Sequence, residues 1–178
     1  MPTSNCLTYE TIDARTFITT GEAAGTAGGT VLFFGIVRNQ ALQRQVTHLV
    51  YEAYEPLAER MIDELISKAM RIWPLLRIQV LHRLGRVEAG EIAVAIEVIS
   101  KHRDEAYKAS RFLIDQIKTD VPVWKKEYFE DGSYRWGQCE HKTVAAGRDR
   151  PLLDGTRHCE STEAVMADEA ISGHDIGT

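Results

Sequence analysis

The sequence predicts an α+β fold in which a mixed or mainly antiparallel sheet is flanked by helices. Four apolar segments have the alternation or β-branched content of strands, and two segments repeat apolar residues at helical spacing. These segments interleave along the chain without a strict strand-helix alternation, which favours α+β over a parallel sheet. The predicted strands cover residues 30–37, 47–54, 77–85 and 90–100.

Length and composition predict one globular domain followed by an extension. The 178 residues are 44% hydrophobic and 26% charged, which is typical of globular proteins. We expect a domain over 1–146 and a loosely ordered polar extension over 147–178, which holds three basic and seven acidic residues. Within the extension, "STEAVMADEAI" has the composition of a short helix.

Several classes of protein are excluded by the same numbers. No apolar run approaches the ~18 residues of a membrane-spanning helix, and the start lacks a signal peptide, so we expect a cytoplasmic protein. A net charge of −5 gives no overall attraction to nucleic acid. Three scattered cysteines, Cys6, Cys139 and Cys159, form no pair typical of a zinc site or a disulfide framework. We therefore expect no metal and no cofactor.

The first half of the chain predicts two strands and a helix. The loop "GTAGG" at 25–29 lacks the ending of a phosphate-binding loop and precedes the first strand, so we interpret it as a flexible connector. The second strand, 47–54, alternates apolar and polar residues. A helix is then predicted from Pro56 to Trp73, because a proline is tolerated in a first turn and Pro74 stops the helix.

The second half predicts a strand pair, a helix and a hairpin. The turn around "RVEAGE" joins strands 77–85 and 90–100. Ser100 is the predicted N-cap of a helix that runs to about Thr119, since Pro122 disfavours helical conformation before it. The dipeptide Asp131-Gly132 between aromatic-rich flanks is typical of a hairpin turn.

The start of the second helix is a candidate anion site. His102 and Arg103 lie where free backbone N–H groups, the helix dipole and a guanidinium all favour an anion such as phosphate. The alternative is that Arg103 only pairs with a neighbouring carboxylate such as Asp104. Arg38, at the end of strand 30–37, is a second arginine that the same anion would attract.

The stretch "DQIKTDVPVWKKE" gathers lysines at the end of the second helix. We expect Trp124 to pack as an anchor and the chain to fold back, so that Lys125 or Lys126 approaches Lys118. Two ammonium groups in one desolvated pocket lower each other's pKa, which suits a nucleophilic or proton-transferring lysine. The alternative is that these lysines are solvated surface cations. We interpret two histidines within strand patterns, His48 and His82, as packed residues and not as ligands.

These segments, in order, resemble the MoaE family, the large catalytic subunits of molybdopterin synthase. The resemblance extends from about Thr30 to Trp136 and is carried by "TVLFFGIVRNQ", "VYEAYEPLAERM", "HRLGRVEAGEIAVAIEVISKHRDEAYKASRFLIDQIKTDVPVWKKE" and "DGSYRW". It implies an α/β hammerhead fold, a homodimer within a heterotetramer, and sulfur transfer to cyclic pyranopterin monophosphate (precursor Z). The implied donor is a small ubiquitin-like subunit whose C-terminal Gly-Gly is activated as a thiocarboxylate.

Site residues follow from the resemblance segment by segment. Lys118 and Lys125 match the catalytic lysines. The substrate-binding segments match Ile36, Val37, Arg38, His102, Arg103, Lys118, Lys125, Lys126 and Glu127. Two other functions remain open from the residues alone: a module that binds a ubiquitin-like tail and an anion without chemistry, and an enzyme that forms a Schiff base through a lysine of lowered pKa.

Overall fold

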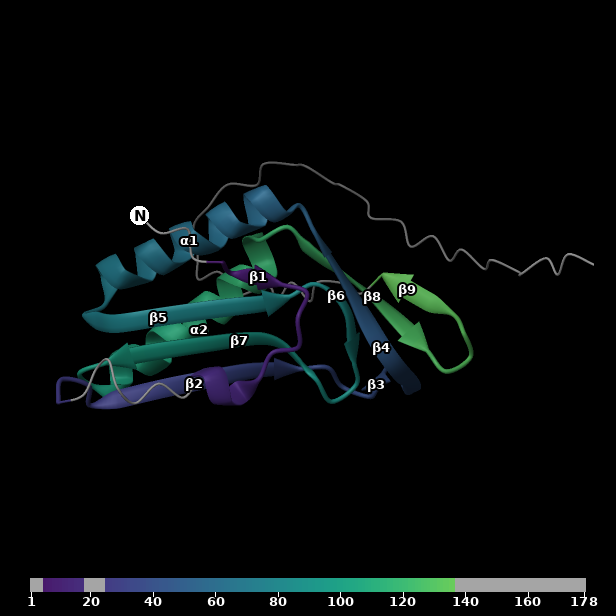
Figure 1. The fold of residues 1–178 in the computed structure, drawn as a ribbon, viewed down its shortest axis with the longest axis horizontal. Coiled ribbons are helices and arrows are strands. Elements are labelled where there is room, and N and C mark those ends of the chain that lie inside the picture. Colours follow the sequence, from purple (N-terminus) through teal and green to yellow (C-terminus); the bar gives the residue numbers. More distant parts are fainter. Residues whose placement is uncertain (1–4, 18–24, 137–178) are drawn as a thin grey trace, which may run out of the picture. The chain divides into compact units, whose positions relative to one another are not determined.

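The structure, a computed structural model, describes residues 5–17 and 25–136. Two sheets and two long helices make up this part of the chain, so the predicted α+β class is confirmed (Figure 1). The predicted extension at 147–178, its short helix, and two cysteines, Cys139 and Cys159, lie outside the described residues.

The first sheet has the strand order β1 (Leu7–Thr8), β5 (Leu75–Arg83), β7 (Ile92–Ser100) and β2 (Gly29–Ile36). Strands β5 and β7 are antiparallel neighbours, as predicted. On its other side β7 pairs with β2, which places Gly29 opposite Ser100 and Ile36 opposite Ile92. Within the described residues β2 is therefore an edge strand.

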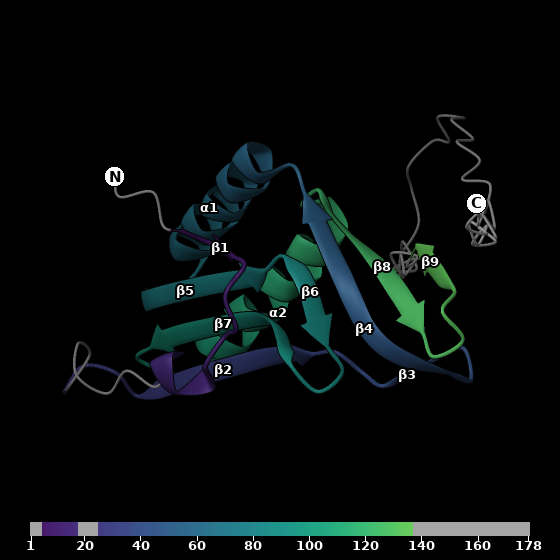
Figure 2. The ribbon, with the colours of Figure 1, turned by 45° about the vertical axis from the view of Figure 1, so that its right-hand side comes forward.

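The second sheet contains β3 (Gln40–Ala41), β4 (Arg44–Ala53), β8 (Val123–Phe129) and β9 (Tyr134–Trp136), in that order. The predicted hairpin is confirmed, because β8 and β9 are antiparallel and Gly132 takes a φ of 80° in the turn between them. The segment "RVEAGE" differs from its prediction as a plain turn. Its first part is a short strand, β6 (Gly85–Glu88), which pairs with β4 (Figure 2).

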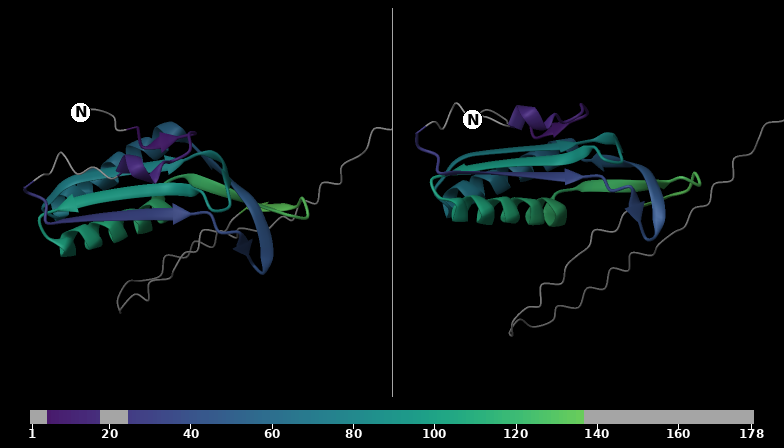
Figure 3. Two further views of the ribbon diagram at one scale, coloured as in Figure 1. Left: turned by 60° about the horizontal axis from the view of Figure 1, so that its bottom comes forward. Right: turned by 90° about the horizontal axis from the view of Figure 1, so that it is seen from below.

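Both predicted helices are present as α1 (Glu55–Ile72) and α2 (Arg103–Asp120). They cover one face of the first sheet, and the one-turn 3-10 helix η1 (Ala14–Phe17) lies on the opposite face (Figure 3). Strand β7 is buried along nearly its whole length because both of its faces are covered. No helix in the described part is long and apolar enough to cross a membrane. The main core includes Ile62, Leu65, Leu84, Val94, Ile96, Val98, Leu113, Ile114 and Ile117.

Ser100 does not cap α2, in contrast to its prediction. It is the last residue of β7, where it is buried between Gly29 and Leu75 on the two neighbouring strands. Its hydroxyl donates a hydrogen bond to the carbonyl oxygen of His102. His102 occupies the N-cap position, and its side chain makes no capping hydrogen bond.

Two glycines at the start of β2, Gly28 and Gly29, do not belong to a plain flexible connector. Gly28 N–H donates to the carbonyl of Ser100 at 3.0 Å, and a Cβ atom at residue 28 would lie 2.0 Å from the carbonyl oxygen of Lys101. A Cβ at Gly29 would lie 3.3 Å from the Cα of Arg103. The absence of side chains at these two positions therefore allows β2 to start directly against the beginning of α2.

This contact predicts that Gly28→Ala is destabilising. The added methyl group collides with backbone, so we expect the free energy of unfolding to fall by about 1–3 kcal/mol. Urea denaturation measures the change, and Ala27→Ser, a similar change at the exposed neighbouring residue, should stay within about 0.5 kcal/mol of the wild type. Equal stability of Gly28→Ala and the wild type would contradict the close approach.

Candidate functional site

Arg38 follows β2 on a backbone that is fixed on both sides. The N–H of Val37 donates to the carbonyl of Glu91 at 3.0 Å, and the carbonyl of Val37 accepts from Gly90 N–H at 2.8 Å. Val37 itself is buried in the second core cluster, whereas Ile36 is 57% exposed. The side chain of Arg38 is exposed and makes no ion pair within the described residues. Its guanidinium is therefore available to an anion.

The start of α2 has the properties of an anion site. His102 and Arg103 are both exposed, and the helix has no side-chain cap, so its first N–H groups are not satisfied by a capping side chain. The alternative pairing of Arg103 with Asp104 is not observed. The Asp104 carboxylate instead accepts a hydrogen bond from Lys108 at 2.6 Å.

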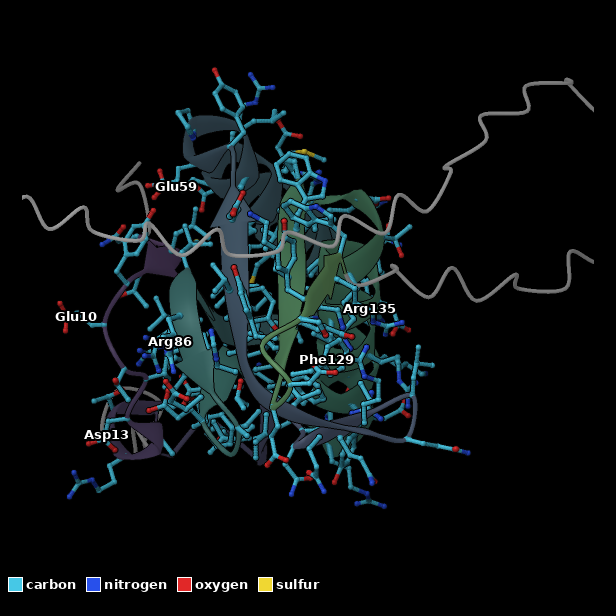
Figure 4. All side chains as sticks on the ribbon, turned by 90° about the vertical axis from the view of Figure 1, so that its right-hand side faces the viewer. Glu10, Asp13, Glu59, Arg86, Phe129 and Arg135 are labelled. Carbon is cyan, nitrogen blue, oxygen red and sulfur yellow. The ribbon has the colours of Figure 1, made fainter. Side chains whose placement is uncertain are left out.

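Lys125 lies in a row of three charged side chains on one face of the second sheet. Its Nζ atom is 3.1 Å from Oε1 of Glu127. The other carboxylate oxygen, Oε2, accepts a hydrogen bond from Nε of Arg135 at 2.8 Å and forms an ion pair with a terminal nitrogen of the same guanidinium at 2.7 Å. The side chain of Glu127 is only 7% exposed. Arg135 lies on the β8–β9 hairpin in Figure 4.

The electrostatics of this row keep Glu127 ionised at neutral pH. Burial by itself raises the pKa of Glu127, but hydrogen bonds from Arg135 and Lys125 outweigh burial, and the pKa is lowered overall. Tyr51 lies opposite Lys125 in the ladder, and burial, followed by the charge of Glu127, raises its pKa to about 12. The Tyr51 ring packs edge-on against His82 at 5.1 Å, and burial lowers the pKa of His82. Neutral rings therefore lie next to the charged row.

The two histidines within strands, His48 and His82, are packed residues, as predicted. His82 is buried against Tyr51, and His48 stacks on Tyr128 with the ring centroids 4.5 Å apart.

Lys126 points away from this row, because successive side chains of a strand alternate between its two faces. Its Nζ lies 2.8 Å from Glu52 and 4.5 Å from the ring centroid of Trp136. The hydrogen bond to Glu52 raises the pKa of Lys126, the opposite of the lowering expected for a lysine in a shared cationic pocket. Trp124 shares this outward face and is 50% exposed, so its prediction as a packing anchor is wrong.

Lys118 lies in the last turn of α2, and its side chain is exposed. Helix α2 runs alongside β2 in the same direction, so its last turn and the end of β2 lie at the same side of the sheet (Figure 3). We call Lys118 and Lys125 the lysine end, and His102 with Arg103 the helix-start pair. Arg103 and Lys118 are 15 residues apart on a straight helix, which separates their Cα atoms by about 22 Å. One copy of the chain thus does not bring the helix-start pair to the lysine end.

Arg135 and Tyr51 were not singled out from the sequence. A hairpin signal existed for Arg135, but its register differs by one residue: a two-residue turn at Asp131-Gly132 would place Glu127 opposite Trp136, whereas the structure pairs Glu127 with Arg135. For Tyr51 no such local signal exists, since its neighbour Lys125 comes from a distant segment.

No group of three His, Cys, Asp or Glu side chains that could bind a metal occurs in residues 5–17 and 25–136. The fold and the exposed cations define an α+β protein with two candidate anion-binding surfaces and one lysine anchored by a buried carboxylate.

Comparison with known proteins identifies the family. The MoaE protein family matches residues 7–120, and the chain belongs to this family. It is 40% identical over 117 residues to a molybdopterin synthase catalytic subunit of Nostoc sp., covering 64% of this chain and 71% of that protein. It is 38% identical over 133 residues to the subunit of that name from Bacillus subtilis, covering 74% and 84%. The crystal structure of molybdopterin synthase from Staphylococcus aureus superimposes with a TM-score of 0.68 at 34% identity, covering 78% of this chain and 98% of that one.

The charged row predicts a pH-dependent contribution of Glu127 to stability. Glu127→Gln leaves two cations without their carboxylate, and we expect a loss of about 1–3 kcal/mol in the free energy of unfolding at pH 7, nearer the lower value because both cations are about one-third exposed. Because the folded-state pKa is lowered, the wild type has this stabilisation above the unfolded pKa of about 4.3 and loses it as pH falls through the folded pKa.

Urea denaturation at pH 7 and at pH 3 measures this contribution. The difference between Glu127→Gln and the wild type should shrink at the lower pH. The control is Glu130→Gln at an exposed site of the same hairpin, which should change little at either pH. A difference that is constant with pH would show that the charge of Glu127 is not the cause.

Proposed function

We propose that this chain, the catalytic subunit of a molybdopterin synthase, transfers sulfur from a small ubiquitin-like subunit to precursor Z and so forms the dithiolene of molybdopterin. The donor is the thiocarboxylate at the C-terminal Gly-Gly of the small subunit. Membership of the MoaE family carries the enzyme class. The observation that supports the residue assignment is the Lys125 ammonium anchored by Glu127, on β8, the strand that follows the last turn of α2 with Lys118.

The lysine end is assigned to the sulfur donor. The thiocarboxylate is an anion, and the ammonium groups of Lys118 and Lys125 supply charge and hydrogen-bond donors to orient it. After the donor sulfur has bonded to the pterin, water attacks the acyl carbon and the C–S bond breaks, which leaves the sulfur on the pterin and a carboxylate on the small subunit. The lysines stabilise the negative charge that develops on the acyl oxygen in this step and move its protons. Glu127 uses one Lys125 donor and leaves the other donors of that ammonium free. Lys126 lies on the opposite strand face, so we do not assign it to this pocket.

Arg38 and the helix-start pair are assigned to the cyclic phosphate of precursor Z. Arg38, His102 and Arg103 are exposed at the ends of elements. An uncapped helix start adds free amides for the phosphate oxygens. Ile36 supplies exposed apolar surface beside Arg38, and Val37 fixes the backbone there.

A pocket that contains both the lysine end and the helix-start pair requires a second copy of the chain. Edge strand β2, "GTVLFFGI", has no charged residue, and Leu32 and Ile36 are 36% and 57% exposed. An uncharged edge of this kind is suited to pairing with another strand. In a two-fold symmetric antiparallel pair, the Gly29 end of one β2 lies beside the Ile36 end of the other. Arg103, which lies next to Gly29, then approaches Arg38 of the second copy. Such a homodimer, with one small subunit at each end, is a heterotetramer.

The assignment of the lysines predicts that Lys118→Ala and Lys125→Ala each reduce dithiolene formation by about 100-fold or more, because each removes a charge that acts on the reacting group. The measurement is product formed from precursor Z and thiocarboxylated small subunit. Lys68→Ala, at an exposed lysine of α1, is the control and should keep wild-type turnover.

Wild-type turnover of both site variants would contradict the assignment. Tight binding of small subunit and precursor Z by the wild-type chain, without any product, would support the binding module instead. Borohydride trapping of a lysine adduct with substrate would support Schiff-base chemistry.

The dimer arrangement predicts that Leu32→Lys weakens self-association by 10-fold or more in dissociation constant, because a charge would be buried at the paired edge (about 1.4 kcal/mol per factor of ten). Sedimentation equilibrium measures the constant. Leu76→Lys, at a residue of the same sheet that is also 36% exposed, is the matched control. Equal association of the two variants would contradict pairing through β2.

A further inference from the structure

We propose that Arg135 is a positioning residue for sulfur transfer: by binding one oxygen of Glu127, it fixes the carboxylate that orients the ammonium of Lys125. This inference rests on the proposed role of Lys125. Arg135 does not touch the reacting atoms, and it acts through Glu127 alone.

The two oxygens of Glu127 have separate partners. Nε of Arg135 donates to Oε2 at 2.8 Å, a terminal nitrogen of Arg135 lies 2.7 Å from the same oxygen, and Nζ of Lys125 lies 3.1 Å from Oε1. Arg135 and Glu127 are direct cross-strand partners in the β8–β9 ladder. Two nitrogens of one rigid guanidinium contact the same oxygen, so Arg135 restrains Oε2 more strongly than a flexible ammonium would. The position of Oε1, and with it the direction of Lys125, therefore depends on Arg135.

The short strand β9 has a clear role in this arrangement. It pairs only with β8 among the described strands, and Arg135 is its inward-facing residue. Its outward-facing neighbours pack on the other side of β8, where Trp136 lies under Lys126 and Tyr134 lies 5.4 Å from Tyr128. These outward contacts anchor the strand, and the anchored strand presents Arg135 to Glu127.

The charges explain why the arginine matters beyond its geometry. Lys125, Glu127 and Arg135 together carry one positive charge, so the row remains attractive to an anionic donor. Without Arg135 the row is neutral, and Lys125 is free to bind both oxygens of Glu127. Tyr51, opposite Lys125 on β4, and His82 of β5, which packs against Tyr51, are neutral near pH 7 and do not compensate.

The test compares Arg135→Gln with Arg135→Lys in steady-state kinetics of the complete synthase. For Arg135→Gln we expect kcat to fall about 10-fold or more, with KM for precursor Z nearly unchanged, because the donor is misplaced and the acceptor is not. The acidic limb of the kcat–pH profile should move up by about 1 unit, since burial of Glu127 is then opposed by one cation and not two. Arg135→Lys retains a charge and should recover part of both changes.

The matched control is Arg44→Gln. Arg44 also binds the hairpin, through an ion pair of 2.6 Å with Asp131 and a contact of 3.8 Å over the Phe129 ring, but it does not touch Glu127. This variant should keep the kcat and the pH profile of the wild type. Equal losses in Arg44→Gln and Arg135→Gln would reduce Arg135 to a structural residue and overturn the proposal. If Arg135→Gln does not fold, the decision rests on Arg135→Lys, whose kcat–pH profile must differ from that of the wild type.

The outcomes separate this inference from the function on which it rests. Full turnover by Lys125→Ala would remove the role of Lys125 and the positioning role together. An inactive Lys125→Ala combined with a wild-type kcat and pH profile for Arg135→Gln would overturn the positioning role alone.

Discussion

The length of α2 is the constraint on which the site depends. An 18-residue helix is stiff, so the helix-start pair and Lys118 remain about 22 Å apart at its two ends. The buried face of α2 fixes the helix along β7 and β2. No side-chain movement of ordinary size closes this distance. A pocket that contains both the helix-start pair and Lys118 therefore requires two copies of the chain. The exposed edge of β2, where the copies would pair, is then as important as the charged residues.

The alternation of β8 is the second constraint, because it divides neighbouring residues between two different surfaces. Lys125 and Glu127 face inward toward Tyr51, whereas Trp124 and Lys126 face outward. The inward row combines a buried carboxylate with two cations, which is favourable only because both of its oxygens are hydrogen-bonded. The outward row is an exposed ion pair and contributes less to stability.

Most of the fold could be predicted from the sequence, because long periodic segments determine their own structure. Strand β6 could not, since four residues are too few to show a period and its pairing with β4 is a tertiary effect. Local preference predicts Ser100 as a cap, but ladder bonds to two strands outweigh that preference. The sequence around Gly28 and Gly29 is typical of a flexible loop, because the backbone that approaches these glycines belongs to a distant segment.

The site was predictable as a set of residues but not as an arrangement. Strand alternation alone separates Lys125 from Lys126, and helix length alone separates Arg103 from Lys118; both inferences were available from the sequence. The contact between Lys125 and Tyr51 was not available, since it depends on which strands pair. The long-range arrangement therefore came from the topology of the sheets.

The most direct test of the account mixes two inactive variants, Arg103→Ala and Lys125→Ala, and measures dithiolene formation after the subunits exchange. If each pocket combines Lys125 of one copy with Arg103 of the other, half of the randomly formed dimers contain one intact pocket, and activity recovers to about a quarter of the wild-type value. If the mixture remains as inactive as its parents while exchange is complete, each pocket belongs to a single chain and the account is wrong.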